Sequence, residues 1–105
     1  MTRVIVAAEA EADIGEILAY LEREAGRRTA AAYGERFIQA IERMADFPGH
    51  GTPRPALGSN ARVAIVYPYL LIYDFNAAHD TATLLRVLHG KRDITERLIN
   101  RPGKS

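Results

Sequence analysis

The sequence contains no cysteine and few of the other residues that usually carry enzyme chemistry. Its 105 residues include only two serines, Ser59 and Ser105, and three well-separated histidines at positions 50, 79 and 89. The missing cysteines exclude disulfide frameworks, thiolate metal sites and cysteine nucleophiles. The histidines match no metal-site spacing, and no glycine-rich loop opens a helix as a phosphate site requires. We therefore expect no metal, no cofactor and no catalytic triad.

Long apolar runs are also missing. Residues 1–8 hold one arginine and an apolar stretch that is too short for a signal peptide or a membrane span. Apolar residues make up 48% and charged residues 26%, which is typical of soluble globular proteins and excludes a disordered chain. We expect one cytoplasmic domain over residues 1–105 without membrane contact, in which 101–105 form a flexible tail.

The net charge of +1 hides an asymmetry between the two halves. Residues 1–50 carry nine acids and six Lys or Arg, whereas residues 51–105 carry four acids and eight Lys or Arg. A basic face would attract nucleic acid or an acidic protein. Equally, such residues can simply keep an ordinary surface soluble. Both interpretations stay open at this point.

The first half of the sequence predicts one short strand and two helices. Residues 2–7 are rich in β-branched side chains, which favour a strand. A first helix follows and ends at Gly26, and a second runs from an N-cap at Thr29 to about Phe47. Their apolar stripes repeat every three or four residues: Ile14, Ile17, Leu18 and Leu21, then Tyr33, Phe37, Ile41 and Met44. Two helices joined this closely form a helical hairpin.

The second half predicts three strands, over residues 62–67, 69–75 and 81–89, after a loop at 48–60. Pro68 belongs at a hairpin corner, because proline cannot donate a hydrogen bond within a sheet. Asp93 and Glu96 have the spacing of a capping box and predict a last short helix to about residue 100. The order β-α-α-β-β-β-α indicates an α+β fold, with the helical hairpin on one face of a mainly antiparallel sheet.

Cationic residues near the predicted sheet are the strongest candidates for function. They are Arg54, Arg62, Arg86, His89 and Arg92. Strand alternation places Arg86 opposite Leu85 and Val87, on the same face as Leu84 and Leu88. If the register brings Arg62 to that face, the arginines form a groove that binds phosphates or carboxylates. The alternative is that Arg86 pairs with an acid such as Asp74 or Asp93.

His89 lies at the end of the last predicted strand and also has two interpretations. It suits a general acid or base. More often such a histidine caps a turn or binds a backbone carbonyl, and we favour that interpretation. Gly90 is then expected to supply the positive φ with which the chain leaves the strand.

Together these elements resemble the ParE/RelE toxin superfamily over residues 2–99. The specific parts are Pro-Tyr-x-x-x-Tyr at residues 68–73 and Leu-Arg-Val-Leu-His-Gly-x-Arg-Asp at residues 85–93, which look more like the ParE branch. The resemblance implies the toxin half of a type II toxin–antitoxin system. ParE-like members inhibit DNA gyrase by protein contact and need no catalytic residue, which agrees with the absences above. Arg86, His89 and Arg92 are then the candidate target contacts.

RelE-like members are instead ribosome-dependent mRNA endoribonucleases. That alternative gives Arg54, Arg62 and Arg86 the role of a phosphate clamp and His89 the role of the acid. The chain departs from the RelE pattern, because its loop has no lysine and no tyrosine follows Tyr73. A third alternative is a non-toxic binding module with a ParE fold.

The resemblance also implies a ParD-like antitoxin as the partner in a hetero-oligomer. The antitoxin brings the DNA-binding part, so this chain alone is not expected to bind DNA sequence-specifically. An antitoxin segment that folds on binding needs an apolar surface. The candidates on the helices and the first hairpin strand are Leu18, Leu21, Tyr33, Phe37, Val63, Ile65 and Tyr67. Plain core packing is the alternative for each of them.

Overall fold

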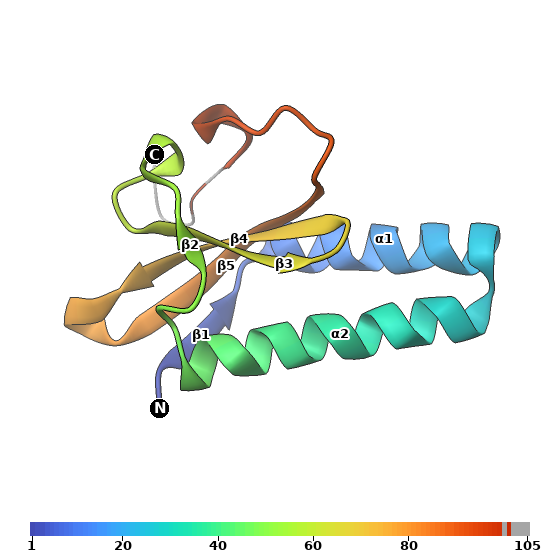
Figure 1. The fold of residues 1–105 in the computed structure, drawn as a ribbon, viewed down its shortest axis with the longest axis horizontal. Coiled ribbons are helices and arrows are strands. Elements are labelled where there is room, and N and C mark those ends of the chain that lie inside the picture. Colours follow the sequence, from blue (N-terminus) through green and yellow to red (C-terminus); the bar gives the residue numbers. More distant parts are fainter. Residues whose placement is uncertain (100, 102–105) are drawn as a thin grey trace.

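The computed structural model describes residues 1–99 and 101. Two long helices lie against one face of a five-stranded sheet (Figure 1). In chain order the elements are β1 (Arg3–Val6), α1 (Ala8–Ala25), α2 (Arg27–Asp46), β2 (Thr52–Pro53), η1 (Pro55–Leu57), β3 (Ala61–Val66), β4 (Tyr69–Asn76), η2 (Ala77–His79), β5 (Thr81–His89) and η3 (Glu96–Leu98). The predicted α+β architecture is confirmed, and the short strand β2 is an addition that the sequence did not indicate.

The strands lie in the order β1-β5-β4-β3-β2. Strand β1 pairs with β5 in parallel, and the other neighbours are antiparallel. Pro68 lies in the turn between β3 and β4, as its missing amide hydrogen led us to expect. Because β1 pairs only with Thr81–Leu84, the last part of β5 is an edge of the sheet that helix α1 approaches.

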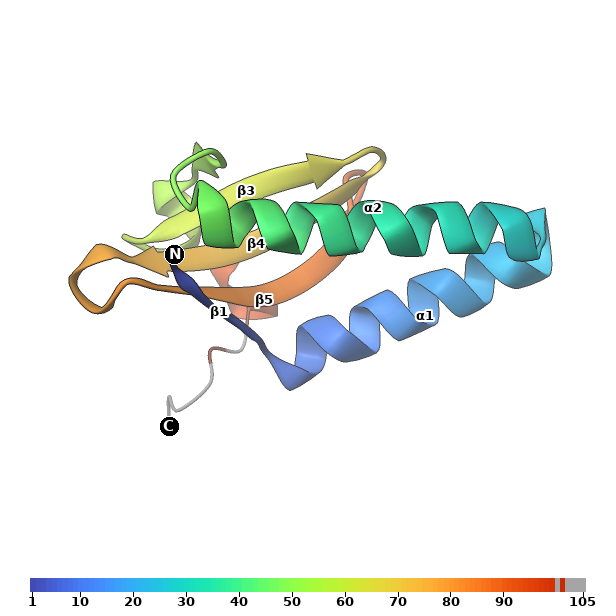
Figure 2. The ribbon, with the colours of Figure 1, turned by 90° about the horizontal axis from the view of Figure 1, so that it is seen from below.

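The helical hairpin turns on a single residue, Gly26. Its φ of 92° is one that residues with a Cβ rarely adopt. The Gly26 amide donates to the Glu22 carbonyl, while its own carbonyl accepts from Ala30, so one residue ends α1 and begins α2. Thr29 is therefore inside α2 and is not its N-cap. The tip of the hairpin extends beyond the sheet (Figures 1 and 2).

Between the helices and the sheet lies the larger of two apolar clusters, which we call the helix-face core. Its buried members are Ala10, Phe37, Met44, Ala64, Val66, Tyr69, Leu71, Tyr73, Ala82, Leu84 and Val87. Three aromatic rings meet there edge to face, with Tyr69 5.9 Å from Tyr33 and 5.8 Å from Phe37 between ring centroids. All four residues of the second predicted stripe belong to or pack against this core, and so do Ile14, Ile17 and Leu18 of the first.

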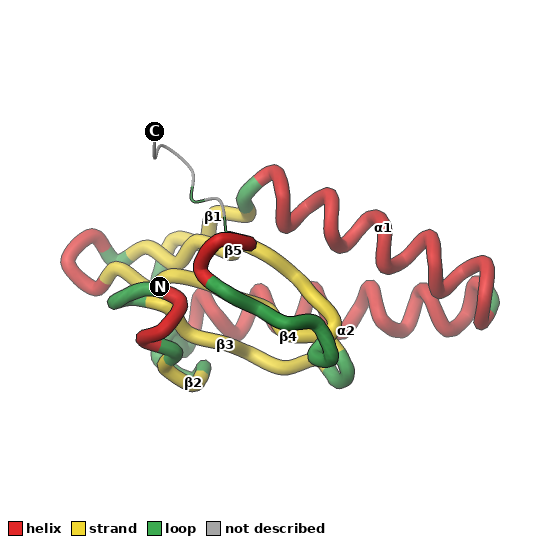
Figure 3. The backbone as a smooth tube through the Cα atoms, turned by 90° about the horizontal axis from the view of Figure 1, so that it is seen from above, coloured by secondary structure: helices red, strands yellow, loops and turns green. Residues whose placement is uncertain are grey.

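The opposite side of the sheet, the back face, carries a smaller cluster. Its buried members are Leu57, Ala61, Val63, Ile72, Leu85, Leu88 and Ile99. The C-terminal segment crosses this side, away from the helices, and Ile94 and Leu98 pack on it (Figures 1 and 3). The predicted helix at 93–100 is wrong for the described residues, which form only the turn η3 without a side-chain cap. Its predicted end at residue 100 lies outside them. Burial of these apolar side chains, and not the local capping pattern, sets the path of the segment.

Candidate functional site

A β-bulge decides which way the side chains of β5 point. The pairing with β4 shifts by one residue between Ile72 and Tyr73, so that Ile72 faces Arg86 and Tyr73 faces Leu84. Leu84 and Val87 therefore belong to the helix-face core, while Leu85 and Leu88 belong to the back face. Strict alternation had grouped these residues differently. The bulge overturns that prediction, because one extra residue inverts the facing of everything beyond it.

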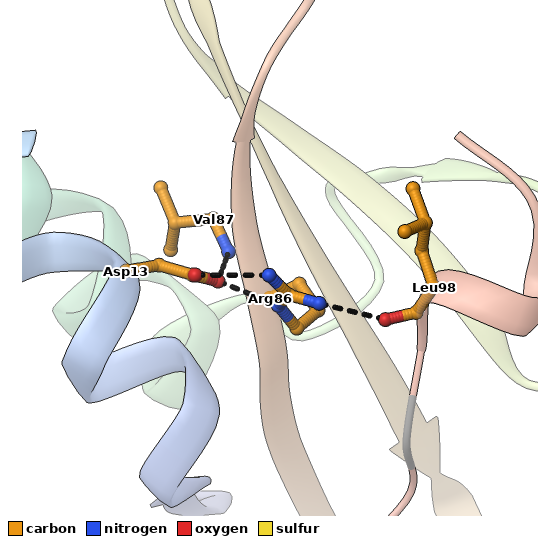
Figure 4. A network of polar contacts seen from close by, with 4 residues as sticks. All are labelled: Asp13, Arg86, Val87 and Leu98. Atoms are coloured by element: carbon orange, nitrogen blue, oxygen red, sulfur yellow. Dashed lines mark hydrogen bonds and ion pairs between the residues drawn. The ribbon is translucent and has the colours of Figure 1, made fainter. Parts of the chain in front are cut away.

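Arg86 is bound on two sides and is not an open cation (Figure 4). Its Nε and Nη2 donate to the two carboxylate oxygens of Asp13 in α1, at 2.7 and 3.0 Å. Its Nη1 donates to the carbonyl of Leu98 at 2.7 Å. The side chains of Arg86 and Asp13 are only 16% and 12% exposed. The hydrogen bonds to Asp13 raise the pKa of Arg86 above its usual value, although desolvation opposes them.

This pair links three parts of the chain. Asp13 Oδ2 also accepts the backbone amide of Val87 at 2.9 Å, so one carboxylate holds both the side chain and the main chain of β5. Arg86 in turn holds the C-terminal segment through Leu98. Pairing of Arg86 with Asp74 or Asp93 is wrong, since the acid is Asp13. Asp13 lies three residues after the buried Ala10 and four before Ile17, and this spacing puts it on the inner side of α1. The spacing is the feature of the sequence that could have identified Asp13 as the partner of Arg86.

Arg62 lies on the other face of the sheet. It is opposite Tyr73 in the register, and its Nη1 donates to the carbonyls of Gly49 and Gly51 at 2.9 and 2.6 Å. The buried Tyr73 hydroxyl donates to Pro48 at 2.7 Å and accepts the Gly51 amide at 3.0 Å. Burial raises the pKa of Tyr73. Arg62 thus anchors the loop after α2, and the predicted convergence of Arg62 and Arg86 on one groove is wrong.

Gly51 and Arg54 complete this loop. A Cβ on Gly51 would lie 2.5 Å from the Tyr73 hydroxyl, so only glycine fits there. The backbone amide of Arg54 donates to Ala61 at 2.9 Å and ties the loop to β3. The Arg54 side chain is half-buried near the end of β2, and Arg86 lies on β5, two strands away from β3. The arginines of the suggested clamp are therefore spread along the sheet.

His89 and Arg92 border an open groove of about 370 Å³ between α1 and the end of β5. The His89 Nδ1 accepts the Lys91 amide at 3.0 Å, and its ring meets that of Tyr69 edge to face at 5.7 Å. His89 therefore caps the turn, as we favoured. Tyr20, 52% exposed, lies in the same groove. Gly90 does not have a positive φ: it lets the chain pass close to Pro68, whose carbonyl accepts its amide at 2.8 Å.

The candidate antitoxin contacts fall into three groups. Phe37 and Val63 are buried in the core, at 1% and 6% exposure, and offer no open surface in this structure. Leu18, Leu21 and Tyr33 are half-buried, and Leu18 and Tyr33 pack against the helix-face core. Ile65 and Tyr67 are 67% and 80% exposed, which is unusual for large apolar side chains of a strand and the turn after it. Among the seven candidates, only these two have exposed side chains.

Within residues 1–99 and 101, no three histidine or acidic side chains gather as a metal site would need. No helix in this part of the chain is both long and apolar enough to cross a membrane. The tail that we expected from residue 101 begins with an anchored residue, because Arg101 pairs with Asp74 at 2.7 Å.

Comparison with known proteins agrees with this architecture. Residues 4–94 match the family model of the ParE toxin of the type II toxin–antitoxin system parDE. The chain is 31% identical over 101 residues to Toxin ParE of Escherichia coli, covering 96% of this chain and 97% of that protein. The fold is also similar to two solved structures. One is the chromosomal ParDE system of P. aeruginosa, at a TM-score of 0.69 and 15% identity, covering 85% of this chain and 96% of that one. The other is the RelBE2 toxin–antitoxin complex of Mycobacterium tuberculosis, at a TM-score of 0.56 and 24% identity, covering 84% and 96%. The chain belongs to the ParE toxin family of type II toxin–antitoxin systems.

Proposed function

We propose that this ParE-family toxin inhibits DNA gyrase by protein contact and is neutralised by a ParD-like antitoxin. The observation that carries the proposal is the state of Arg86. Its guanidinium is engaged by Asp13 and by the Leu98 carbonyl, on the face of the sheet opposite Arg62. A phosphate clamp for RNA cleavage needs cations that converge and face solvent. Inhibition by contact has no such requirement.

The groove between α1 and β5 is the candidate contact surface for gyrase. His89 and Arg92 are exposed at its rim, beside the partly exposed ring of Tyr20. An aromatic ring next to cationic or polar groups is a frequent composition for a protein contact. Arg86 lies below this rim and holds its two sides, α1 and β5, together. We therefore remove Arg86 from the candidate contacts with gyrase. His89 and Arg92 stay candidates, and Tyr20 joins them.

The antitoxin belongs to the proposal for two reasons. The chain is in a family of toxin–antitoxin systems, and its two fold neighbours come from such systems. It also presents the exposed side chains of Ile65 and Tyr67, which a partner would cover. His89 borders a hollow together with Ile65 and Tyr67, so a partner that covers these two residues lies next to the groove at its His89 end.

The test uses purified gyrase and purified ribosomes. We expect the chain to block supercoiling by gyrase and to leave ribosome-bound mRNA intact. Replacing both His89 and Arg92 by alanine should weaken the inhibition about tenfold or more, because a few contact residues contribute most of the binding energy of an interface. The matched control replaces Arg27 and Arg28, exposed at the hairpin tip, and should leave it unchanged. Codon-positioned mRNA cleavage by the wild-type chain, with gyrase unaffected, would refute the proposal.

A further inference from the structure

One strand of the sheet has an outer edge that is only partly paired. Strand β2 faces β3 only at Val63 and Arg62. Along Ala64–Val66 no described strand lies on the outer side of β3. Such an edge is a template for another strand, and proteins usually blunt it with charges, proline or a covering element. This stretch, Ala-Ile-Val, carries neither a charge nor a proline.

The backbone geometry identifies the residue that an added strand would meet. The Ala61 carbonyl accepts the Arg54 amide on the outer side of β3. In an antiparallel strand the outward-facing residues alternate, so Val63 and Ile65 face outward as well. Continuing the β2 register would place His50 opposite Ile65, but the His50 amide donates to Phe47 instead. The backbone N–H and C=O of Ile65 therefore point outward at the open edge of β3.

Hollows of opposite character flank this edge. On the side of α2 a groove of about 450 Å³ is lined by Arg36, Arg43 and His50, and no carboxylate lines it. On the back face a hollow of about 510 Å³ is lined largely by apolar groups, among them Ile65, Leu70 and the ring of Tyr67, with His89 and Lys91 at one end. Both hollows share Ile65 and Tyr67, so they meet at the edge of β3.

We propose that an extended partner segment in which acidic and apolar side chains alternate completes the sheet at this edge. Successive side chains of a strand point to opposite faces. Acidic ones would reach the arginines of α2, and apolar ones would fill the back-face hollow. Main-chain bonds to Ile65 would supply affinity, as in other strand additions. The inference deepens the proposed function, on which it rests, because the antitoxin would provide this segment.

Charge and polarity favour this occupant over two others. A second copy pairing through its own β3 would bring the cationic grooves of both α2 helices together, and like charges across an interface are unfavourable. A nucleic acid suits the arginines of the groove. It offers nothing to the apolar hollow or to the backbone of Ile65.

The test is NMR on the 15N-labelled full chain, with a synthetic peptide in which glutamate alternates with valine as the probe. We expect shift changes along Ala64–Tyr67 and α2, and slower amide exchange at Ile65. Replacing glutamate by lysine in the peptide should weaken binding about tenfold or more, since the groove is cationic. Arg36→Glu with Arg43→Glu should do the same, and the control pair Arg27→Glu with Arg28→Glu should not. Variant spectra establish that each protein is folded.

Several outcomes would overturn the inference. They are equal binding of the lysine peptide, no binding at millimolar concentration, and shift changes confined to the groove between α1 and β5, at Tyr20 and Arg92. Concentration-dependent protection of Ile65 without peptide would assign the edge to a second copy, and the same shifts with an oligonucleotide would assign it to nucleic acid. Gyrase inhibition is measured separately on the same variants. Peptide binding without gyrase inhibition would refute only the proposed target, and the reverse would refute only the strand addition.

Discussion

The two faces of the sheet are closed by different means. The helix face is covered by two helices of 18 and 20 residues, and its core contains fully buried Phe37, Met44 and Tyr73. The back face is covered by a loop and by a C-terminal segment whose described residues are helical only in the single turn η3. Apolar burial of this extent holds the helices in place. The short segment on the back face buries much less and depends on additional contacts.

Two arginines provide those contacts. Arg86 reaches the Leu98 carbonyl from β5, and Arg101 binds Asp74 of β4 through Nε at 2.7 Å and Nη2 at 3.1 Å. Arg101 Nη2 also donates to the carbonyl of Leu57, and the hydrogen bonds to Asp74 raise the pKa of Arg101 above its usual value. Hydrophobic packing by two long helices therefore holds the helix face, whereas the cover of the back face combines a smaller apolar cluster with charged hydrogen bonds.

The largest expected effect is on the helix face. Phe37→Ala removes a ring that is 1% exposed and packs on Tyr33 and Tyr69, and it leaves a cavity. We expect the free energy of unfolding to fall by about 3–5 kcal/mol. Urea denaturation measures it. Ile38→Ala, at a neighbouring position 51% exposed, is the control and should cost less than about 1 kcal/mol. Equal effects of the two variants would contradict the central role of the helix-face core.

The next largest effect is expected for the pair of Asp13 and Arg86, which links α1 to the cover of the back face. Asp13→Ala leaves the guanidinium of Arg86 and the amide of Val87 without their acceptor in a largely buried place. Removing one partner of such a pair should lower the free energy of unfolding by about 2–4 kcal/mol. Glu22→Ala, an exposed acid on the same helix, is the control. A loss below that of the control would mean that Arg86 is not a structural residue, and the phosphate-clamp alternative would regain support.

The helix face could be predicted well because its signals are local. The stripes Ile14–Leu21 and Tyr33–Met44 repeat at helical spacing, and helices of this length bury such stripes wherever they pack. The turn at Gly26 follows from the freedom of glycine. The family resemblance likewise depended on strand motifs close together in the sequence.

The candidate site could not be predicted in the same way. The face to which its β5 side chains point depends on the bulge opposite Ile72 and Tyr73. The bulge is a property of the strand pairing, and the apolar pattern of β5 alone does not reveal it. The partner of Arg86 is 73 residues away, so charge type alone could not select Asp13 over Asp74 or Asp93. The capping-box pattern at Asp93 failed for a related reason, because tertiary burial of Ile94 and Ile99 outweighed a local preference.

A smaller effect is expected where the back-face cover ends. Arg101→Ala removes the bidentate pair with Asp74, whose side chains are 18% and 24% exposed. Because water screens such a pair in part, the free energy of unfolding should fall by only about 1–2 kcal/mol. Amide exchange at Ile99 should quicken while exchange in α2 stays as it is. Arg97→Ala, exposed in η3, is the control. Equal acceleration in α2 would show that the two faces do not open separately.

The smallest effect concerns one polar anchor of the helix face, the hydroxyl of Tyr73. Tyr73→Phe removes the hydroxyl that bonds Pro48 and Gly51, and should lower the free energy of unfolding by about 1 kcal/mol at neutral pH. Tyr67→Phe, at an 80% exposed ring, is the control. Burial raises the pKa of Tyr73, so the folded state holds this proton more tightly than the unfolded state. The associated stability is present below the unfolded value of about pH 10 and is lost as pH rises through the folded pKa.

The variant should therefore lose less stability than the wild type in alkali. The difference between the two should shrink as pH increases above about 10, measured by urea denaturation at a series of pH values. Some alkaline decline should persist in the variant, because burial also raises the pKa of Tyr69. If Tyr73→Phe cost more at neutral pH than Arg101→Ala, polar anchoring would matter more on the helix face than on the back face. The contrast between how the helix face and the back face are held would then be reversed.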